Sequence, residues 1–279
     1  MSSKRVERFA PSPTGLLHLG HGFSALTAAD GADRFLLRIE DIDRARCRPA
    51  YVTALFEDLA WLGLTWETPV LRQSERRAAY DAAVARLTEL GLTYPCTCTR
   101  GDIKAALSAP QEGAPLHGPD GLIYPGTCRH AGRDAEGAAI RLDMARAVAI
   151  TGPLQFKELD NPDGPNGTVT VTPDHMIREI GDIVLARRDI GTSYHIAVTV
   201  DDAEQGITHV TRGQDLFTAT PIHRLLQVLL GLPEPIYRHH RLIRDDQGKR
   251  LAKRDDARAL RAYREAGMTP AAVIRLMAP

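Results

Sequence analysis

The segment RFAPSPTGLLHLGH, residues 8–21, constrains the fold of this chain more than any other. It joins a short apolar run, which predicts a buried strand, to a run of small and apolar residues that predicts a helix. His18 and His21 lie three residues apart and share one face of the first helical turn, with Gly20 between them. Backbone N–H groups at a helix start attract phosphate, so this turn is a candidate phosphate site. Alone, the same spacing also suits two exposed histidines.

Strand-like and helix-like segments alternate along residues 1–93. The apolar run RFLLRIEDID predicts a second strand, and residues 49–64 and 74–92 have helical periodicity. Ser74 is the expected N-cap of the helix over 74–92, and Gly91 is its expected end. This order predicts an α/β fold with a parallel sheet, and ligands of such sheets bind beyond the carboxyl ends of the strands.

The pattern changes in residues 94–190, which contain turns rich in Cys, Pro and Gly and short strand-like pieces such as GTVTVTP. We interpret this segment as an insertion between two halves of one catalytic domain, 1–93 and 191–243. Residues 244–279 then supply a charged loop and two short helical stretches. The expected elements of the second half are apolar runs over 193–203 and 207–216 flanking a short helix, a helix over 219–232 and a strand over 237–243.

Net charge does not identify a partner, because 35 Lys and Arg residues balance 35 Asp and Glu residues. Any RNA contact must come from a local patch such as 187–189 or 238–241, and these patches equally suit a solvated surface. The amino terminus lacks the apolar segment of a signal peptide, and no run approaches the roughly 18 apolar residues of a membrane helix. We therefore expect a cytoplasmic, monomeric protein with no membrane contact.

Three of the four cysteines, Cys96, Cys98 and Cys128, fall within one turn-rich segment. In a reducing compartment, clustered cysteines favour a metal site over disulfides. Three thiolates leave one position open in the tetrahedral coordination of zinc, and ordinary zinc chemistry favours His117 or His130 for it. The alternative is a group of three unligated thiols.

A basic loop, GKRLAKRDD at residues 248–256, lies near the other end of the chain. Such a loop can close over a polyphosphate and supply positive charge as negative charge moves in the transition state. By itself, the loop equally suits a solvated run of charges. Its combination with the HLGH segment favours a nucleotide site.

The segments RFAPSPTGLLHLGH and RLAKR resemble the HIGH and KMSKS motifs of class I aminoacyl-tRNA synthetases, specifically the glutamyl branch. RIEDID, YHIAVTVDD and THVTRGQDL match that branch in the same order, so the resemblance covers nearly the whole chain. It departs at Arg250, which replaces a lysine, and at Ala252, which replaces a serine. The resemblance implies a Rossmann-like, doubly wound parallel sheet with an inserted α+β segment that contains a zinc subdomain and an acceptor-like subdomain.

The resemblance also implies roles for individual residues. Glu40 would bind the α-ammonium of glutamate, while Arg212 with Arg8 and Tyr194 would bind its side-chain carboxylate. His18, His21 and Lys253 would be catalytic and would contact ATP, which binds with Mg²⁺. The full glutamate set is Arg8, Ala10, Ser12, Glu40, Tyr194 and Arg212, the ATP set is His18, Gly20, His21 and Lys253, and the zinc ligands are Cys96, Cys98, Tyr124 and Cys128.

Only a short tail follows Lys253, whereas glutamyl-tRNA synthetases continue into a helical domain that reads the anticodon. The family with the catalytic half alone comprises the glutamyl-queuosine tRNA(Asp) synthetases. We therefore expect activation of L-glutamate by ATP without tRNA, then transfer to the queuosine base in the anticodon loop of tRNA(Asp). The alternatives are a shortened glutamyl-tRNA synthetase that charges the terminal ribose, a non-catalytic zinc-containing RNA-binding paralogue and, more weakly, a nucleotidyltransferase of the same superfamily.

Overall fold

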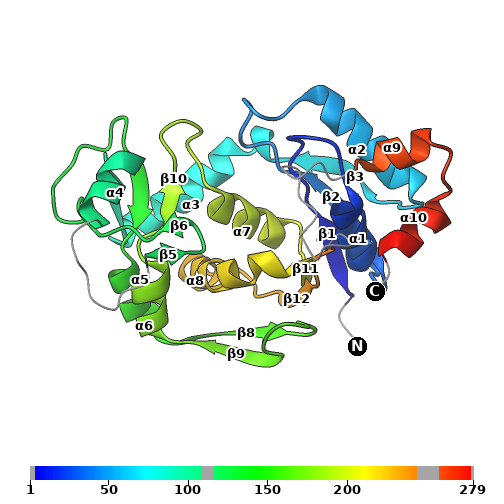
Figure 1. Cartoon of the computed structure of the whole chain (residues 1–279). Coiled ribbons are helices and arrows are strands. Elements are labelled where there is room, and N and C mark those ends of the chain that lie inside the picture. The colour runs from blue at the N-terminus through cyan, green and yellow to red at the C-terminus, as the bar shows by residue number, and fades with distance from the viewer. Residues whose placement is uncertain (1–3, 108–115, 244–257, 278–279) are drawn as a thin grey trace.

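The computed structural model describes residues 4–107, 116–243 and 258–277, and a central layer of strands organises the chain (Figure 1). Parallel pairing joins three strands in the order β1-β2-β3, and a second ribbon has the order β11-β12-β8-β9, with only the β8–β9 pair antiparallel. The strands are β1 (Val6–Phe9), β2 (Arg34–Ile39), β3 (Glu67–Arg72), β8 (Leu154–Glu158), β9 (Gly167–Val171), β11 (His209–Gly213) and β12 (Ile236–His240).

The two ribbons meet between β1 and β11. The backbone N–H of Thr208, just before β11, donates to the carbonyl of Val6 at 3.0 Å. The spatial order is therefore β3-β2-β1-β11-β12, which runs outward in both directions from the centre, as in doubly wound folds. This arrangement confirms the expected α/β fold with a parallel sheet, and it places a topological switch point at the ends of β1 and β11.

Helices cover both faces of the sheet, and successive side chains of β2 point to opposite faces. Phe35, Leu37 and Ile39 pack with one set of helices, whereas Leu36 packs with the other set. The first set contains α1 (Leu19–Ala29), α2 (Pro49–Trp61), α9 (Leu260–Glu265) and α10 (Pro270–Met277), and the second contains α3 (Arg77–Glu89), α7 (Tyr194–Glu204) and α8 (Thr220–Leu230). None of the helices in the described part of the chain is long and apolar enough to cross a membrane.

Two local expectations are wrong. The run over 193–203 forms helix α7 itself, capped by the Ser193 side chain, rather than a segment beside a helix. Its Ile, Val and Thr residues favour strands, but burial between the sheet, α3 and α8 overrides that preference. Ser74 does not cap α3; its N–H and hydroxyl both donate to Asp41 at 2.8 Å, and the N-cap position belongs to Arg76. Gly91, with a φ of +70°, ends this helix as expected.

The segment between the two halves of the sheet forms a small antiparallel sheet in the order β10-β7-β4 and a two-stranded hairpin. Strand β8 also comes from this segment but pairs in parallel with β12, with Glu158 opposite Tyr237. The elements are β4 (Thr93–Cys96), α4 (Arg100–Leu107), β5 (His117–Gly118), β6 (Gly121–Leu122), β7 (Ala139–Leu142), α5 (Met144–Thr151), α6 (Pro173–His175) and β10 (Val184–Ala186), and the short turns of helix are η1 (Gln73–Glu75), η2 (Met176–Ile180) and η3 (Gln214–Ala219).

Candidate active site

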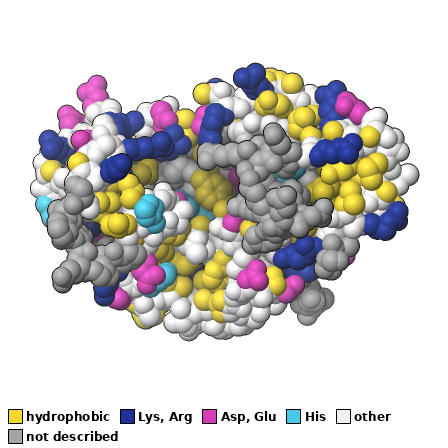
Figure 2. All heavy atoms as spheres, in the orientation of Figure 1, with side chains coloured by type: hydrophobic (Ala, Val, Ile, Leu, Met, Phe, Trp, Pro, Cys, Tyr) yellow, Lys and Arg dark blue, Asp and Glu magenta, His cyan; other side chains and the backbone are white. Residues whose placement is uncertain are grey.

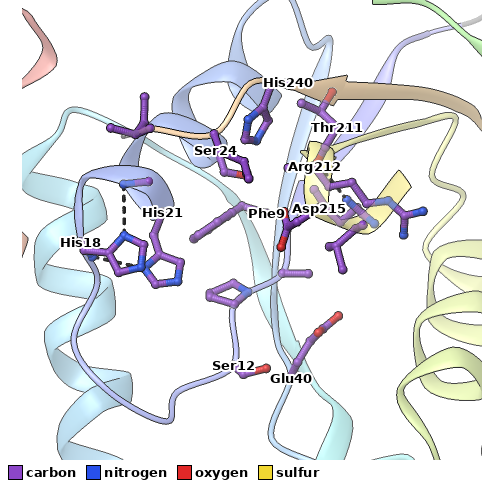
Figure 3. Close-up of a pocket in the computed structure, with 18 of the residues that line it drawn as sticks. Phe9, Ser12, His18, His21, Ser24, Glu40, Thr211, Arg212, Asp215 and His240 are labelled. Carbon is purple, nitrogen blue, oxygen red and sulfur yellow. Dashed lines mark hydrogen bonds between the residues drawn. The ribbon is translucent and has the colours of Figure 1, made fainter. Parts of the chain in front are cut away.

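A pocket of about 340 Å³ opens at the switch point, beyond the carboxyl ends of β1 and β11. Figure 3 shows His18 and His21 on one side of it, Arg212 and Asp215 on the other, and Ser12 with Glu40 at one end. The pocket brings together the sequence-predicted residues Arg8, Ala10, Ser12, His18, Gly20, His21, Glu40, Tyr194 and Arg212. These residues come from six separate elements or loops, so their convergence is a property of the fold.

The two histidines of HLGH hold the start of α1 in a reciprocal capping arrangement (Figure 3). Nδ1 of His18 accepts the backbone N–H of Gly20 at 3.1 Å, and Nδ1 of His21 accepts the N–H of His18 at 3.2 Å. Because Nδ1 accepts in both rings, the proton of each neutral imidazole lies on Nε2. A Cβ on Gly20 would come within 3.1 Å of the His18 ring. Neither histidine is fully exposed, since His18 is buried and His21 half-buried.

A buried charge network lies behind the pocket where β1 and β2 end. Arg8 donates to both oxygens of Asp202, at 2.8 and 3.1 Å, while Arg38 donates to Asp202 at 2.7 Å and to Glu40 at 3.3 Å. Burial opposes ionisation of Asp202, but the two arginines outweigh it and lower its pKa to about 2. Burial raises the pKa of Glu40 to about 6 despite Arg38. Glu40 is therefore the carboxylate of the pair that a bound cation would stabilise.

Arg212, at the end of β11, is held by three neighbours. It donates from Nε to Nε2 of His239 at 3.0 Å, from Nη1 to Nδ1 of His223 at 3.0 Å and from Nη2 to the hydroxyl of Thr220 at 2.7 Å. Among the described residues these bonds use three of its five N–H groups, so two remain for a ligand in the pocket. Burial raises the pKa of Tyr194, which keeps this residue a phenol with a hydroxyl donor.

Sequence reasoning missed the residues behind the pocket. Arg38 is a charged residue within the apolar run of β2, and Asp202 belongs to the motif VTVDD. Both residues were therefore noticeable in the sequence, but nothing there indicated what they bind. The patch 238–241 suited a solvated surface, but that interpretation is wrong for His239 and His240, which are buried. Their burial follows from the position of β12 inside the sheet.

The basic loop predicted to contact ATP spans residues 248–256. Lys253, Arg250 and Ala252 lie outside the described residues. The chain resumes close to the pocket, because Ala259 forms a β-bridge with His18. Ala259 therefore lies beside the start of α1.

The cysteines Cys96, Cys98 and Cys128 converge beside β4, with their Sγ atoms within 4.8 Å of one another. The Oη atom of Tyr124 lies 3.4 Å from the Sγ atoms of both Cys96 and Cys98, and it accepts the N–H of Cys128 at 2.8 Å. Burial opposes ionisation of Cys128, yet hydrogen bonds, chiefly from Tyr124, lower its pKa to about 6. No histidine of the described chain belongs to this cluster. A metal held here would have three sulfur donors and one oxygen donor.

The surface is hollowed between the segment that contains α4 to α6 and the elements α1, α2 and α9, as the space-filling view shows (Figure 2). Lys and Arg side chains gather along the upper edge of this hollow. A basic edge beside a concave surface suits the approach of a polyanion.

Comparison with known proteins agrees with this geometry. A family model described as "tRNA synthetases class I (E and Q), catalytic domain" matches residues 5–278. A relative from Rhodobacter capsulatus, named glutamyl-Q tRNA(Asp) synthetase, is 58% identical over 98% of this chain and 99% of its own length. A relative of the same name from Nocardia farcinica is 43% identical over 97% of this chain and 82% of its own.

A solved structure adds the fold. The crystal structure of a glutamate tRNA ligase from Elizabethkingia meningosepticum, in complex with its amino acid, matches 99% of this chain with a TM-score of 0.73 and 26% identity. The match covers 60% of that ligase, so this chain spans less than two thirds of its length. Since the family match runs through both halves of the parallel sheet and the segment between them, the chain belongs to the class I aminoacyl-tRNA synthetases, in the catalytic-domain family of the glutamate and glutamine enzymes.

Proposed function

We propose that this protein activates L-glutamate with ATP in the pocket at the switch point, without RNA, and then transfers the glutamate to the queuosine base of tRNA(Asp). The observation that carries the proposal is that one pocket contains side chains suited to glutamate and a helix start suited to phosphate. The name of the relatives, glutamyl-Q tRNA(Asp) synthetase, supports the acceptor. The protein is accordingly a ligase of the aminoacyl-tRNA synthetase class.

Glutamate recognition needs groups for one ammonium and two carboxylates. Glu40 would bind the α-ammonium. Arg38 alone does not offset the burial of the ionised carboxylate, and the positive charge of the ammonium would stabilise it further. Arg212, Arg8 and Tyr194 would bind the side-chain carboxylate through N–H and O–H donors. Glutamine would place an amide N–H group against the same donors, and a site with unpaired buried donors discriminates strongly.

In the activation step, an α-carboxylate oxygen of glutamate attacks the α-phosphorus of ATP, the bond from that phosphorus to the bridging oxygen breaks, and pyrophosphate leaves. The Nε2–H groups of His18 and His21 would donate to the phosphates, and Gly20 would leave room for the nucleotide. Magnesium bound with ATP would offset phosphate charge.

Lys253 would pair with the departing pyrophosphate. Lys253→Ala should therefore slow adenylate formation about 100-fold in single-turnover kinetics, while the KM for glutamate changes less than about twofold.

Zinc is the metal that the cysteine cluster suits best. Zn–S bonds of about 2.3 Å and Zn–O bonds of about 2.0 Å give tetrahedral edges of about 3.8 Å between sulfurs and about 3.5 Å between sulfur and oxygen. The corresponding edges are 3.5 Å between Cys98 and Cys128, and 3.4 Å from Tyr124 to both Cys96 and Cys98. These distances support a closed structural zinc site with Tyr124 as the fourth ligand. Bound zinc would hold the turns around β4 together.

In the second step, a hydroxyl of the queuosine cyclopentenediol would attack the activated acyl group and release AMP. The test uses labelled glutamate and tRNA(Asp) from which the terminal adenosine has been removed, so that ribose charging cannot occur. The expected result is that queuosine-containing tRNA(Asp) becomes labelled, whereas the same tRNA with guanine in place of queuosine does not. Labelling of only intact tRNA(Glu) would instead identify a shortened glutamyl-tRNA synthetase.

A further inference from the structure

A chain of hydrogen-bonded side chains, buried except at its far end, connects the pocket to residues 94–190. Nη1 of Arg212 lies 3.0 Å from Nδ1 of His223, and Nε2 of His223 lies 3.0 Å from Nδ1 of His195. Nε2 of His195 then lies 2.8 and 3.0 Å from the two carboxylate oxygens of Asp120. The four residues come from β11, α8, α7 and the turn between β5 and β6, so the chain crosses the molecule from the sheet to the hairpin (Figure 1).

Only one assignment of protons satisfies this chain. An arginine can only donate, so Nδ1 of His223 accepts and the proton of its neutral ring lies on Nε2. That Nε2–H donates to Nδ1 of His195, whose own proton therefore lies on Nε2 and faces Asp120. The ionised Asp120 can only accept, so every hydrogen bond of the chain is donated in the direction from Arg212 toward Asp120. Burial and the charge of Arg212 keep the pKa of His223 well below its usual range, which is consistent with a neutral ring.

A second branch holds the other edge of the same guanidinium. Nε of Arg212 donates to Nε2 of His239, and Nδ1 of His239 lies 2.6 Å from Glu158. Burial, aided by Arg212, lowers the pKa of His239 to about 4, although the hydrogen bond to Glu158 opposes this. Two branches of histidines, each ending on a carboxylate, thus fix the plane in which Arg212 presents its remaining donors. A guanidinium recognises a carboxylate through paired N–H groups, so this plane sets the quality of the contact.

The two branches end differently. Glu158 is fully buried in β8, whereas the Asp120 side chain is 50% exposed on the hairpin of the insertion. Removing Glu158 would leave buried polar groups unpaired, which threatens the fold itself. Asp120 can be replaced with little disturbance of packing, because water can reach its position. It is therefore the point at which the orientation of Arg212 can be tested without unfolding the core.

We propose that Asp120, acting through His195 and His223, is a positioning residue that sets how well Arg212 binds the side-chain carboxylate of glutamate. The inference rests on the proposed function, in which Arg212 is the carboxylate ligand. A carboxylate at position 120 enforces a single pair of histidine tautomers. An amide there could turn its NH₂ group toward His195 and reverse both tautomers, which would direct an N–H of His223 at Arg212.

The test compares Asp120→Asn and Asp120→Glu with the unmodified chain in glutamate-dependent pyrophosphate exchange. Asp120→Asn should raise the KM for glutamate about tenfold, the scale at which outer partners act on a binding group, with kcat and the KM for ATP within about twofold. Asp120→Glu keeps an acceptor-only group and should restore the KM to within about threefold of the original. Asp174→Asn is the matched control, since Asp174 lies in the same segment, is 76% exposed and pairs only loosely with Arg178 at 3.8 Å.

A second readout does not depend on activity. Long-range ¹H–¹⁵N spectra of the histidine side chains should show Nε2–H tautomers for His195 and His223 in the unmodified chain and mixed tautomers in Asp120→Asn. Normal exchange in the unmodified chain together with an unchanged glutamate KM in Asp120→Asn would overturn this inference alone. No glutamate-dependent exchange in the unmodified chain would overturn the proposed function and the inference with it.

Discussion

At the residue scale, the site assigns different partners to two nearby carboxylates. Asp202 accepts from both Arg8 and Arg38, and its pKa falls to about 2. Among the described residues the Glu40 carboxylate accepts only from Arg38, at 3.3 Å, and its pKa is raised to about 6. Asp202 is thus neutralised inside the protein, and Glu40 is stabilised only when another cation arrives. The difference explains how a pocket with buried arginines can still attract an ammonium group.

The pKa of Glu40 predicts an acid limit for glutamate activation. Above about pH 6 the carboxyl is ionised and attracts the α-ammonium of glutamate; below it, protonation removes that charge. The kcat/KM for glutamate in pyrophosphate exchange should therefore fall about tenfold for each pH unit below 6. Glu40→Gln has no such group and should have a low kcat/KM without this acid limb. A constant kcat/KM from pH 5 to pH 7 in the unmodified chain would contradict this role.

The sequence predicted those parts of the site whose residues lie close together along the chain. The HLGH and RFAPSPTG residues belong to one short segment whose turn and helix start can be derived locally. Asp202 lies 194 positions from Arg8, and Asp120 lies 75 positions from His195, so nothing local indicates either pairing. Long-range partners of this kind require the sheet order before they can be assigned.

At the scale of elements, the start of α1 combines two tasks in the same side chains. His18 caps the helix through Nδ1, and the same ring is proposed to contact phosphate through Nε2. The β1–α1 unit was predictable because its strand, turn and helix signals agree. Helix α7 was not, because its β-branched residues favour a strand and only burial against α3 and α8 selects the helix.

Substitution of His18 should separate these tasks. His18→Asn keeps a side-chain oxygen for the N–H of Gly20, so the free energy of unfolding in urea should change by less than about 0.5 kcal/mol. His18→Ala lacks this acceptor and should lose about 1 kcal/mol. Both variants lose Nε2–H, and both should slow pyrophosphate exchange about 100-fold. Exchange by His18→Asn at the original rate would show that the ring acts only as a cap.

At the scale of the whole molecule, residues 94–190 contact both the parallel sheet and the residues around the pocket. Strand β8 extends the sheet beyond β12, and the hairpin turn reaches Arg212 through two histidines. The sequence predicted the segment from its turns, but it could not show that part of it joins the sheet. Pairing of β8 with β12 depends on contacts across about 80 positions, for which a local pattern carries no signal.

The proposed zinc should stabilise this segment. The purified chain should contain about one zinc per molecule by atomic absorption, and Cys98→Ser should lose it and melt at a lower temperature, since structural zinc contributes directly to folding. Cys47→Ser is the matched control, because Cys47 lies outside the cluster. Zinc content that is equal in all three proteins, or absent from the unmodified chain, would contradict the site.

The central claim is that this pocket activates glutamate by itself, and exchange of labelled pyrophosphate into ATP with no RNA present tests it most directly. The account predicts exchange that requires L-glutamate, and glutamine should support less than about one hundredth of the rate. Exchange that begins only when tRNA(Glu) is added would contradict the account in favour of a shortened glutamyl-tRNA synthetase. Absence of exchange under every condition would leave the pocket without the proposed chemistry.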